Sequence, residues 1–281
     1  CGPDEIGLGA KTDGIMELPD DAEVGMAGAD YFNINEDIVF EIGLTPNRSD
    51  AMSHIGVARD LKAVLNSRGD DLKMCIPSIK DFKIDNKDLT IDVKIESEAL
   101  CPRYSGVSIS NVIVNESPDW LKHKLLSIGI NPINNIVDIT NYVLHETGQP
   151  LHAFDTEKIL GKEIIVKTLN KDTNFITLDE NKRKLSEDDL MICNAEVPMC
   201  IAGVFGGLDS GVTNDTKSIF IESAYFDPTS IRKTAKYHKL NTDASFRYER
   251  GCDPNITVYA LKRAALLVQE LCGGLISSEI V

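Results

Sequence analysis

The chain has 281 residues, of which 42% are hydrophobic, enough for one large or two ordinary domains with a sizeable core. No apolar run approaches the roughly 20 residues of a membrane span, and the first residues, CGPDEIGLGAK, lack the layout of a signal peptide. The seven cysteines are odd in number, scattered, and never form a C-x-x-C pair, so neither a disulfide framework nor a zinc site is predicted. A reducing cytoplasm is the expected compartment.

Charge is distributed unevenly along the chain. The formal net charge is −15, and residues 1–41 contribute −10 of it, with eleven acidic residues against one lysine. Residues 231–250 instead carry six basic residues against two acidic ones. Such a stretch suits a phosphate backbone, but it also suits a solvated helix face, and the sequence leaves both interpretations open.

The first third of the chain is rich in turn-forming residues. Residues 1–36 combine Gly, Asp and Pro with short apolar pieces, which is typical of the end of a β-rich domain. Ser49 or Asp50 is expected to cap the helix that follows. The apolar face of that helix would hold Met52, Ile55, Ala58, Leu61 and Leu65. Residues 66–88 are polar and predict a linker.

Helices and strands are mixed irregularly after residue 88. Pro118 near the start and Gly129 past the end predict a helix between them. Asp253-Pro254 predicts the start of a last long helix, which would end near Gly273. Alternating or apolar stretches predict strands at 89–95, 104–113, 164–169, 190–193 and 218–224. Because there is no regular βαβ alternation, the sequence predicts an α+β fold with a mixed sheet.

An unusually polar window runs from residue 129 to 155, GINPINNIVDITNYVLHETGQPLHAFD. Its apolar residues recur near helical spacing, and Gly148 is a plausible helix end. A helix that only filled a core would keep polar residues on its outer face and would use better helix formers than Asn and Thr. The window therefore predicts a ligand-contacting helix that holds Thr140 and Asn141, with His152 on the turn that follows. The alternative is a capped helix and a structurally satisfied histidine.

Four glycines cluster at positions 203, 206, 207 and 211. Glycine allows positive φ and lets the backbone approach a ligand without a Cβ in the way. The pattern G-x-x-x-x-G-K-[ST] is absent, so a nucleotide-binding loop is not predicted. Tight turns between strands remain an equal alternative.

A carboxylate interrupts the apolar strand SIFIESA. Alternation places Phe220, Glu222 and Ala224 on one face of this strand, which is expected to be buried on both sides. An unpaired buried charge is very costly, so Glu222 needs a partner. That partner is either an arginine such as Arg247 or Arg250, or a ligand hydroxyl.

Three stretches in fixed order resemble the editing module, called B3/B4, of the bacterial phenylalanyl-tRNA synthetase beta subunit. They are the window at 129–155, then AGVFGGLDSGV with IFIESAYFDP, and then HKLNTDASFRYERGCDP. Upstream, EIGLTPNRSDAMSHIGVARDLKAVL is similar to the segment that joins the tRNA-binding OB-fold of that subunit to its editing module. Several long motifs in one order are far more specific than a single glycine pattern.

The resemblance implies a site that hydrolyses tyrosine wrongly esterified to tRNA(Phe). Phenylalanine and tyrosine differ by one hydroxyl, and an apolar pocket rejects an added hydroxyl only by about a hundredfold, so a second site restores fidelity. By resemblance, His152, Thr140 and Asn141 are catalytic, and Glu222, Gly203, Gly206, Thr242 and Ala244 bind the amino acid. The residues expected to contact RNA are Arg232, Lys233, Lys236, Lys239 and Arg247. We expect a positioned water to attack the ester, with the role of His152 as a general base left open.

The resemblance also implies an organisation and partners. Residues 1–36 would be the incomplete tail of an OB-like domain, 37–88 a helical connecting segment with a linker, and 89–281 the B3/B4-like domain. The partners would be tRNA(Phe) and an alpha subunit in a heterotetramer, with no membrane and no DNA. No cofactor or metal is expected in this chain, since ATP and magnesium would serve synthetic parts of the parent enzyme. The alternatives are a non-catalytic tRNA-binding or subunit-bridging module and a free-standing editing protein.

Overall fold

A computed structural model describes residues 2–6, 14–32 and 37–281, which divide into two compact units at 1–40 and 41–281. The described part of the first unit contains a 3-10 turn, η1 (Pro3–Ile6), and a short helix, α1 (Gly28–Tyr31), and no strand. The predicted OB-like tail and the predicted domain boundaries therefore remain predictions.

The second unit begins with a helix, α2 (His54–Ser67), after a 3-10 turn, η2 (Ser49–Ala51). Ser53 is the N-cap, and its hydroxyl oxygen accepts a hydrogen bond from the backbone N–H of Gly56 at 3.0 Å. The sequence placed this cap at Ser49 or Asp50, but those residues form the preceding turn. Only the first turn of α2 is buried, and Leu61 on its predicted apolar face is 55% exposed.

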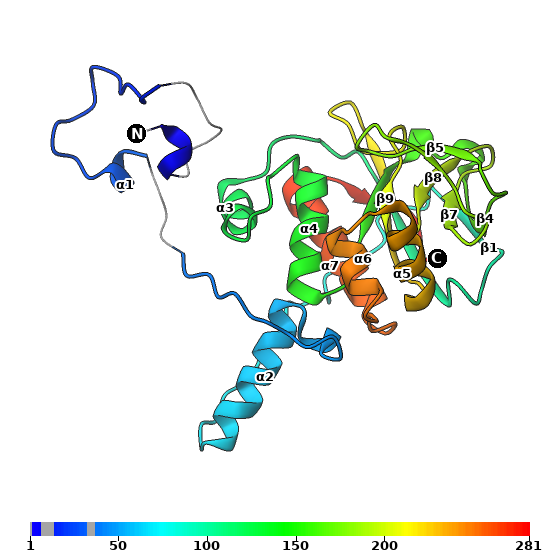
Figure 1. Ribbon diagram of the computed structural model, residues 1–281, viewed down its shortest axis with the longest axis horizontal. Coiled ribbons are helices and arrows are strands. Elements are labelled where there is room, and N and C mark those ends of the chain that lie inside the picture. Colours follow the sequence, from blue (N-terminus) through cyan, green and yellow to red (C-terminus); the bar gives the residue numbers. More distant parts are fainter. Residues whose placement is uncertain (1, 7–13, 33–36) are drawn as a thin grey trace. The chain divides into compact units, whose positions relative to one another are not determined.

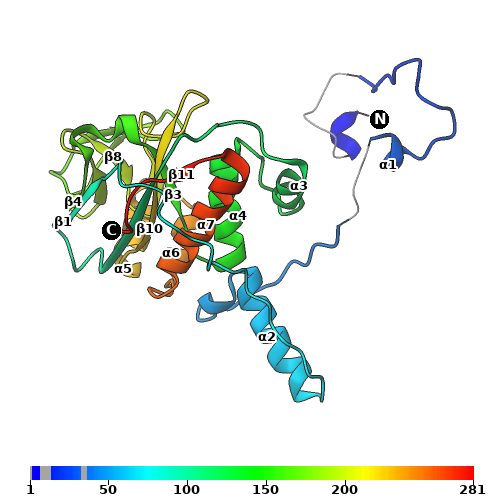
Figure 2. The same ribbon diagram turned by 180° about the vertical axis from the view of Figure 1, so that it is seen from behind.

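A four-stranded antiparallel sheet, ordered β11-β2-β10-β3, positions the site. Its strands are β2 (Arg103–Ser110), β3 (His152–Asp155), β10 (Ser218–Tyr225) and β11 (Leu275–Ile276). Helices α4 (Asn135–Thr147) and α7 (Thr257–Cys272) pack side by side over one face, as Figures 1 and 2 show. Apolar residues of the sheet and the helices form one continuous cluster there, which buries the helix stripes from water.

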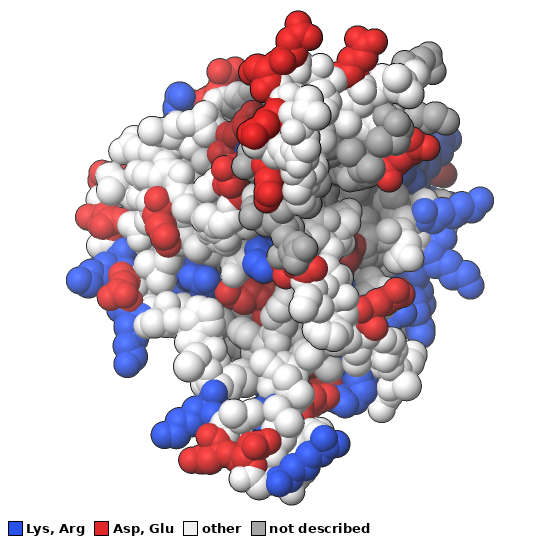
Figure 3. Space-filling view, turned by 90° about the vertical axis from the view of Figure 1, so that its left-hand side faces the viewer, with Lys and Arg blue, Asp and Glu red and all other residues white. Residues whose placement is uncertain are grey.

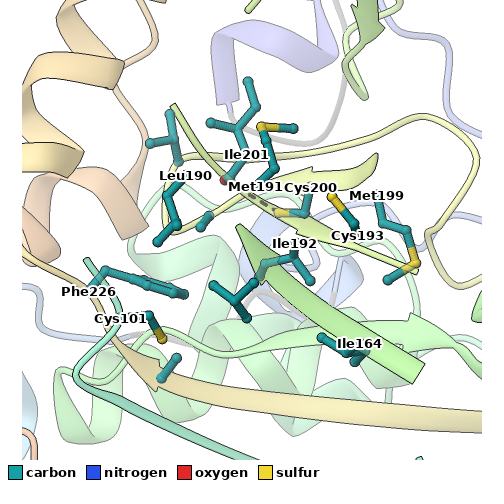
Figure 4. Packing of buried hydrophobic residues seen from close by; sticks show 14 of the residues in the cluster. Cys101, Ile164, Leu190, Met191, Ile192, Cys193, Met199, Cys200, Ile201 and Phe226 are labelled. Atoms are coloured by element: carbon teal, nitrogen blue, oxygen red, sulfur yellow. Dashed lines mark hydrogen bonds between the residues drawn. The ribbon is translucent and has the colours of Figure 1, made fainter. Parts of the chain in front are cut away.

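A five-stranded mixed sheet, ordered β1-β4-β7-β8-β9, lies on the other side. Its strands are β1 (Asp92–Ile95), β4 (Glu163–Thr168), β7 (Leu190–Cys193), β8 (Pro198–Ile201) and β9 (Phe205–Gly206). The pair β1–β4 is parallel and the other pairs are antiparallel. A second apolar cluster fills the space beside this sheet, and Figure 4 shows residues of β7 and β8 packed near Phe226 and Cys101.

The remaining elements close the fold. They are α3 (Asp119–Ser127), η3 (Thr156–Lys158), η4 (Leu160–Lys162), a hairpin of β5 (Asn174–Ile176) and β6 (Lys182–Lys184), α5 (Pro228–His238) and α6 (Asp243–Tyr248). The predicted helix ends are confirmed at Gly148 and Gly273, which have positive φ. The last helix begins at Thr257, after Asp253-Pro254 rather than at it. The architecture is α+β with mixed sheets, as the sequence predicts, and no helix among the described residues is long and apolar enough to cross a bilayer.

Candidate functional site

Two predicted site residues are direct neighbours across the four-stranded sheet. Glu222 on β10 is the register partner of His152 on β3. Because directly opposite residues point to the same face, with Cβ atoms about 5 Å apart, both side chains project toward the five-stranded sheet. The sequence separates these residues by seventy positions, and the strand register brings them together.

Glu222 is buried, with only 5% of its surface exposed. Its carboxylate accepts a hydrogen bond from the phenol of Tyr104 at 2.8 Å. No ion pair joins Glu222 to a basic residue in the described part of the chain, because Arg247 pairs with Asp243 and Arg250 pairs with Glu249. The structural ion pair considered from the sequence is therefore absent. Burial raises the pKa of Glu222 to about 8, and the hydrogen bond from Tyr104 opposes that rise.

His152 is the first residue of β3, so it lies in a strand and not on the predicted turn. Its ring meets the edge of Phe154, with ring centroids 4.4 Å apart. The Nε2 atom is shielded from solvent and makes no hydrogen bond with any described residue. Burial lowers the pKa of His152 to about 4, so the imidazole is neutral at pH 7. A neutral imidazole with an unpartnered nitrogen can bind a water or a ligand hydroxyl.

The predicted glycines lie around these two residues. A Cβ at Gly206 would stand 3.3 Å from Cε1 of His152 and 2.8 Å from a methyl of Leu178, so a side chain there would crowd the imidazole. Gly203 has φ +65°, and a Cβ there would stand 2.9 Å from Ile231, Phe226 and Tyr248 alike. Gly203 requires glycine for space and for backbone conformation, whereas a side chain at Gly206 would have to displace the end of Leu178 and crowd His152.

The motif NTDAS is tied to the same loop. Thr242 is the N-cap of α6, and its hydroxyl group also donates to the backbone carbonyl of Val204 at 2.9 Å. Val204 lies between the two predicted glycines, so this bond attaches the start of α6 to the loop. Ala244 is part-buried and packs against the apolar cluster that includes Phe220 and Tyr104. Thr242 is thus joined to the glycine loop, and the role of Thr242 and Ala244 in an amino-acid site stays a prediction.

Thr140 and Asn141 lie on α4, which covers the opposite face of the sheet. The hydroxyl of Thr140 donates to the carbonyl of Val137 at 2.7 Å. No hydrogen bond joins either residue to Glu222 or His152 within residues 37–281. Gly148 ends α4 shortly before β3, so the helix fixes where His152 enters the sheet. The role of Thr140 and Asn141 in the site therefore stays a prediction.

The predicted basic residues separate into two groups. Arg232, Lys233, Lys236 and Lys239 are exposed on the outer side of α5 and at its C-cap, while the inner side of α5 is buried in the apolar cluster. Arg247 is 8% exposed and its guanidinium contacts Asp243 and His145, so it does not join that exposed face. Figure 3 shows one side of the molecule, on which both basic and acidic side chains are present.

Two hollows lie away from Glu222 and His152. One of about 490 Å³ is lined by residues of β5, β8 and the segment 207–210, and one of about 230 Å³ lies between residues 49–59 and 251–256. Arg247 lines the smaller hollow, and Glu222 and His152 line neither. Glu222 is buried and His152 is half-buried. Within residues 2–6, 14–32 and 37–281, no group of three or more His, Cys, Asp or Glu side chains could hold a metal ion.

Sequence reasoning missed Tyr104, the hydrogen-bond donor to Glu222. It was identified only as the start of a strand. Its contact depends on the pairing of β2 with β10, in which Tyr104 lies opposite Ala224 and diagonal to Glu222. No local pattern in the sequence encodes that pairing.

The fold and these contacts define an α+β domain that encloses a carboxylate and an imidazole between two sheets. A family described as the B3/4 domain matches residues 100–273. The phenylalanine–tRNA ligase beta subunit of Bacteroides fragilis is 59% identical over 280 residues, and that of Porphyromonas gingivalis is 52% identical over 275. These alignments cover 100% and 98% of this chain and 34% of each relative, so the chain spans about a third of their length.

A solved structure is also similar, the N-terminal fragment of the phenylalanyl-tRNA synthetase beta-subunit from Pyrococcus horikoshii. Its TM-score is 0.47 at 18% identity, covering 83% of this chain and 60% of that one. The chain belongs to the B3/4 domain family, and along its whole length it is similar to part of phenylalanine–tRNA ligase beta subunits. The resemblance indicated by the three motifs is confirmed.

Proposed function

We propose that this chain carries the editing site of a phenylalanine–tRNA ligase and hydrolyses tyrosine wrongly esterified to tRNA(Phe). One observation supports this most strongly. A buried carboxylate, Glu222, lies beside a neutral imidazole, His152, with no basic residue paired to it in the described chain. Such groups are costly in a core that only serves stability, so they suit a ligand with a hydroxyl and a reactive ester.

Selectivity would come from Glu222. A tyrosine phenol can donate a hydrogen bond to this carboxyl group, and such a bond favours its ionised form. Phenylalanine brings no donor, so its ring would leave the second carboxyl oxygen buried without a partner. A hydrogen bond to a charged group contributes roughly 1.5–3 kcal/mol, which gives a useful preference for tyrosine.

Hydrolysis would use a water molecule at His152. The water oxygen attacks the ester carbonyl carbon, the bond to the terminal ribose oxygen breaks, and that oxygen takes up a proton. The unpartnered Nε2 of His152 would orient the water or the tRNA terminus. Thr140 and Asn141 are proposed to support this geometry from α4, and Gly203, Gly206, Thr242 and Ala244 to shape the amino-acid pocket.

The wider assignments follow from the similarity to the beta subunits. We propose tRNA(Phe) and an alpha subunit as partners, a cytoplasmic location, and ATP with magnesium as requirements of the parent enzyme alone. The exposed basic residues of α5 would contact the RNA backbone, since phosphate contacts are made by such side chains.

Deacylation assays on the intact parent enzyme test this proposal. Tyrosyl-tRNA(Phe) is expected to be hydrolysed well above the uncatalysed rate, and phenylalanyl-tRNA(Phe) is expected to be spared. Equal, background-level hydrolysis of both esters would overturn the editing function. A non-catalytic tRNA-binding or subunit-bridging module would then be the better description.

A further inference from the structure

Tyr104 occupies a distinctive place beside Glu222. Both are fixed by the pairing of β2 with β10, and the phenol reaches diagonally across the sheet to the carboxylate. Gly106, the register partner of Glu222, has no side chain, and the ring of Phe220 lies over it, 2.0 Å from where a Cβ would be. The space over Gly106 is thus filled by Phe220, which leaves Tyr104 and His152 as the polar neighbours of Glu222 on β2 and β3.

The other titratable groups near Glu222 supply no positive charge. They are Cys101 before β2, Cys200 on β8 and Tyr248 on α6, and burial raises the pKa of each above its usual value, so all are neutral at pH 7. His152 on β3 is neutral as well. In the described part of the chain, Tyr104 is the one hydrogen-bond donor to the Glu222 carboxyl group. Its phenol alone opposes the effect of burial on that group.

We infer that Tyr104 is a positioning residue that determines the selectivity of the site for tyrosine. Its phenol holds Oε2 of Glu222, which fixes the plane of the carboxyl group and leaves Oε1 to accept the phenol of a bound tyrosine. This inference rests on the proposed function and deepens it, because it makes a resident phenol part of the recognition of a substrate phenol.

The physical reason lies in the geometry and the ionisation of the acceptor. Without the Tyr104 hydroxyl, the carboxyl group loses the contact that fixes its rotamer, and it becomes harder to ionise in a buried site. A neutral, freely rotating acid offers a weaker acceptor to the substrate phenol. Hydrolysis of tyrosyl-tRNA then loses rate, while hydrolysis of phenylalanyl-tRNA has no such bond to lose.

Tyr104→Phe in the intact parent enzyme tests the inference, with Tyr248→Phe as a matched control. Tyr248 is also a buried tyrosine of the same apolar cluster, but its hydroxyl donates to the carbonyl of Ala224 at 3.1 Å and not to Glu222. The measurement is the ratio of tyrosyl- to phenylalanyl-tRNA(Phe) deacylation rates from pH 6 to 9, with uncatalysed hydrolysis subtracted.

Tyr104→Phe is expected to lower the ratio about 10-fold or more and to move its pH profile to higher pH. Tyr248→Phe is expected to keep both the ratio and the profile, even if it destabilises the fold. If the wild type is selective and Tyr104→Phe leaves the ratio or the profile unchanged, the role of Tyr104 is overturned and the editing function stands. If the wild type does not hydrolyse tyrosyl-tRNA, both the function and this role fall.

Discussion

The two faces of the four-stranded sheet are formed by the same strands but bury different kinds of side chain. The face under α4 and α7 is largely apolar, and the buried hydroxyl of Ser223 on this face donates to the carbonyl of Thr257 at 2.8 Å. The face toward the second sheet carries Glu222 and His152, and it also buries the hydroxyl oxygen of Ser108 without a partner. The hydroxyl of Ser223 is hydrogen-bonded, whereas Oγ of Ser108 and Nε2 of His152 on the other face have no partner among the described residues.

This difference supports the proposed site on the face that carries Glu222 and His152. Burying a hydroxyl or an imidazole without a hydrogen bond costs of the order of 1–3 kcal/mol per group. Native cores keep such groups rare, and the two on Ser108 and His152 lie on the face that carries Glu222, which supports the proposed ligand site there. The helix-covered face supplies the rigidity that a site of this kind needs.

The largest expected effect comes from breaking the helix-covered face. Ile221 is fully buried there and projects away from Glu222. Ile221→Ala is expected to lower the free energy of unfolding by about 2–5 kcal/mol, through lost apolar contact and the cavity left behind. Urea denaturation measures this change. Selectivity for tyrosyl-tRNA, measured per folded molecule, should be unchanged. A loss of selectivity in the folded variant would contradict the assignment of stability to one face and of recognition to the other.

A second substitution removes the carboxylate from the face that carries Glu222 and His152. Glu222→Ala is expected to lower selective tyrosyl-tRNA deacylation by roughly 10- to 150-fold while the protein still folds, since the substrate phenol loses its bond to a carboxyl group whose ionised form that bond favours. Deacylation rates and melting temperature are measured on the same preparation. A large loss of stability with activity and selectivity per folded molecule intact would end the recognition role of Glu222.

Titration sharpens the comparison further. The pKa of Glu222 is about 8 in the folded chain and near 4.5 when exposed, so the folded state holds the extra proton between these pH values. Relative to Glu222→Gln, the wild type should therefore lose stability as pH rises from about 4.5 to 8, by at most about 1.4 kcal/mol per pH unit. Urea denaturation of both proteins at pH 5, 6.5 and 8 gives the difference. A difference that is constant with pH would contradict the raised pKa.

His152 should act on the acid side with the opposite slope. Its pKa is about 4 when folded and about 6.5 when exposed, so the unfolded chain binds the extra proton between these values. Relative to His152→Gln, the wild type should lose stability as pH falls from 6.5 to 4. His145 has a similarly lowered pKa and is present in both proteins, so its contribution cancels in the comparison. A wild type that instead gains stability on acidification would show that His152 is not held neutral.

The smallest expected effect concerns the proposed RNA contacts of α5, a helix that packs into the same apolar cluster as Phe220. Lys233→Glu and Lys236→Glu on α5 should each weaken tRNA(Phe) binding by the parent enzyme a few-fold and reduce the salt dependence by about one ion. The matched control is Lys83→Glu, which changes an exposed lysine of the polar segment after α2. Binding is measured by titration at several salt concentrations. Equal effects of all three variants would indicate general charge repulsion and not a defined RNA contact.

Local sequence determined much of this molecule. Glycine ended α4 at residue 148 because the chain there takes positive φ, and Pro118 preceded α3 where its fixed φ suits a helix start. The apolar run at 218–224 predicted a strand buried on both faces, because such a pattern can only lie between two layers. The ordered motifs also indicated the family and the candidate residues on both sides of the sheet.

Tertiary structure alone decided how those residues meet. Strand register placed His152 opposite Glu222 and brought Tyr104 to the carboxylate, and register depends on pairings between segments far apart in the chain. Arg247 is buried and paired with Asp243, so it does not lie among the exposed basic residues. A local sequence pattern records which residue types are present, but the cost of burying a charge depends on neighbours that only the folded chain supplies.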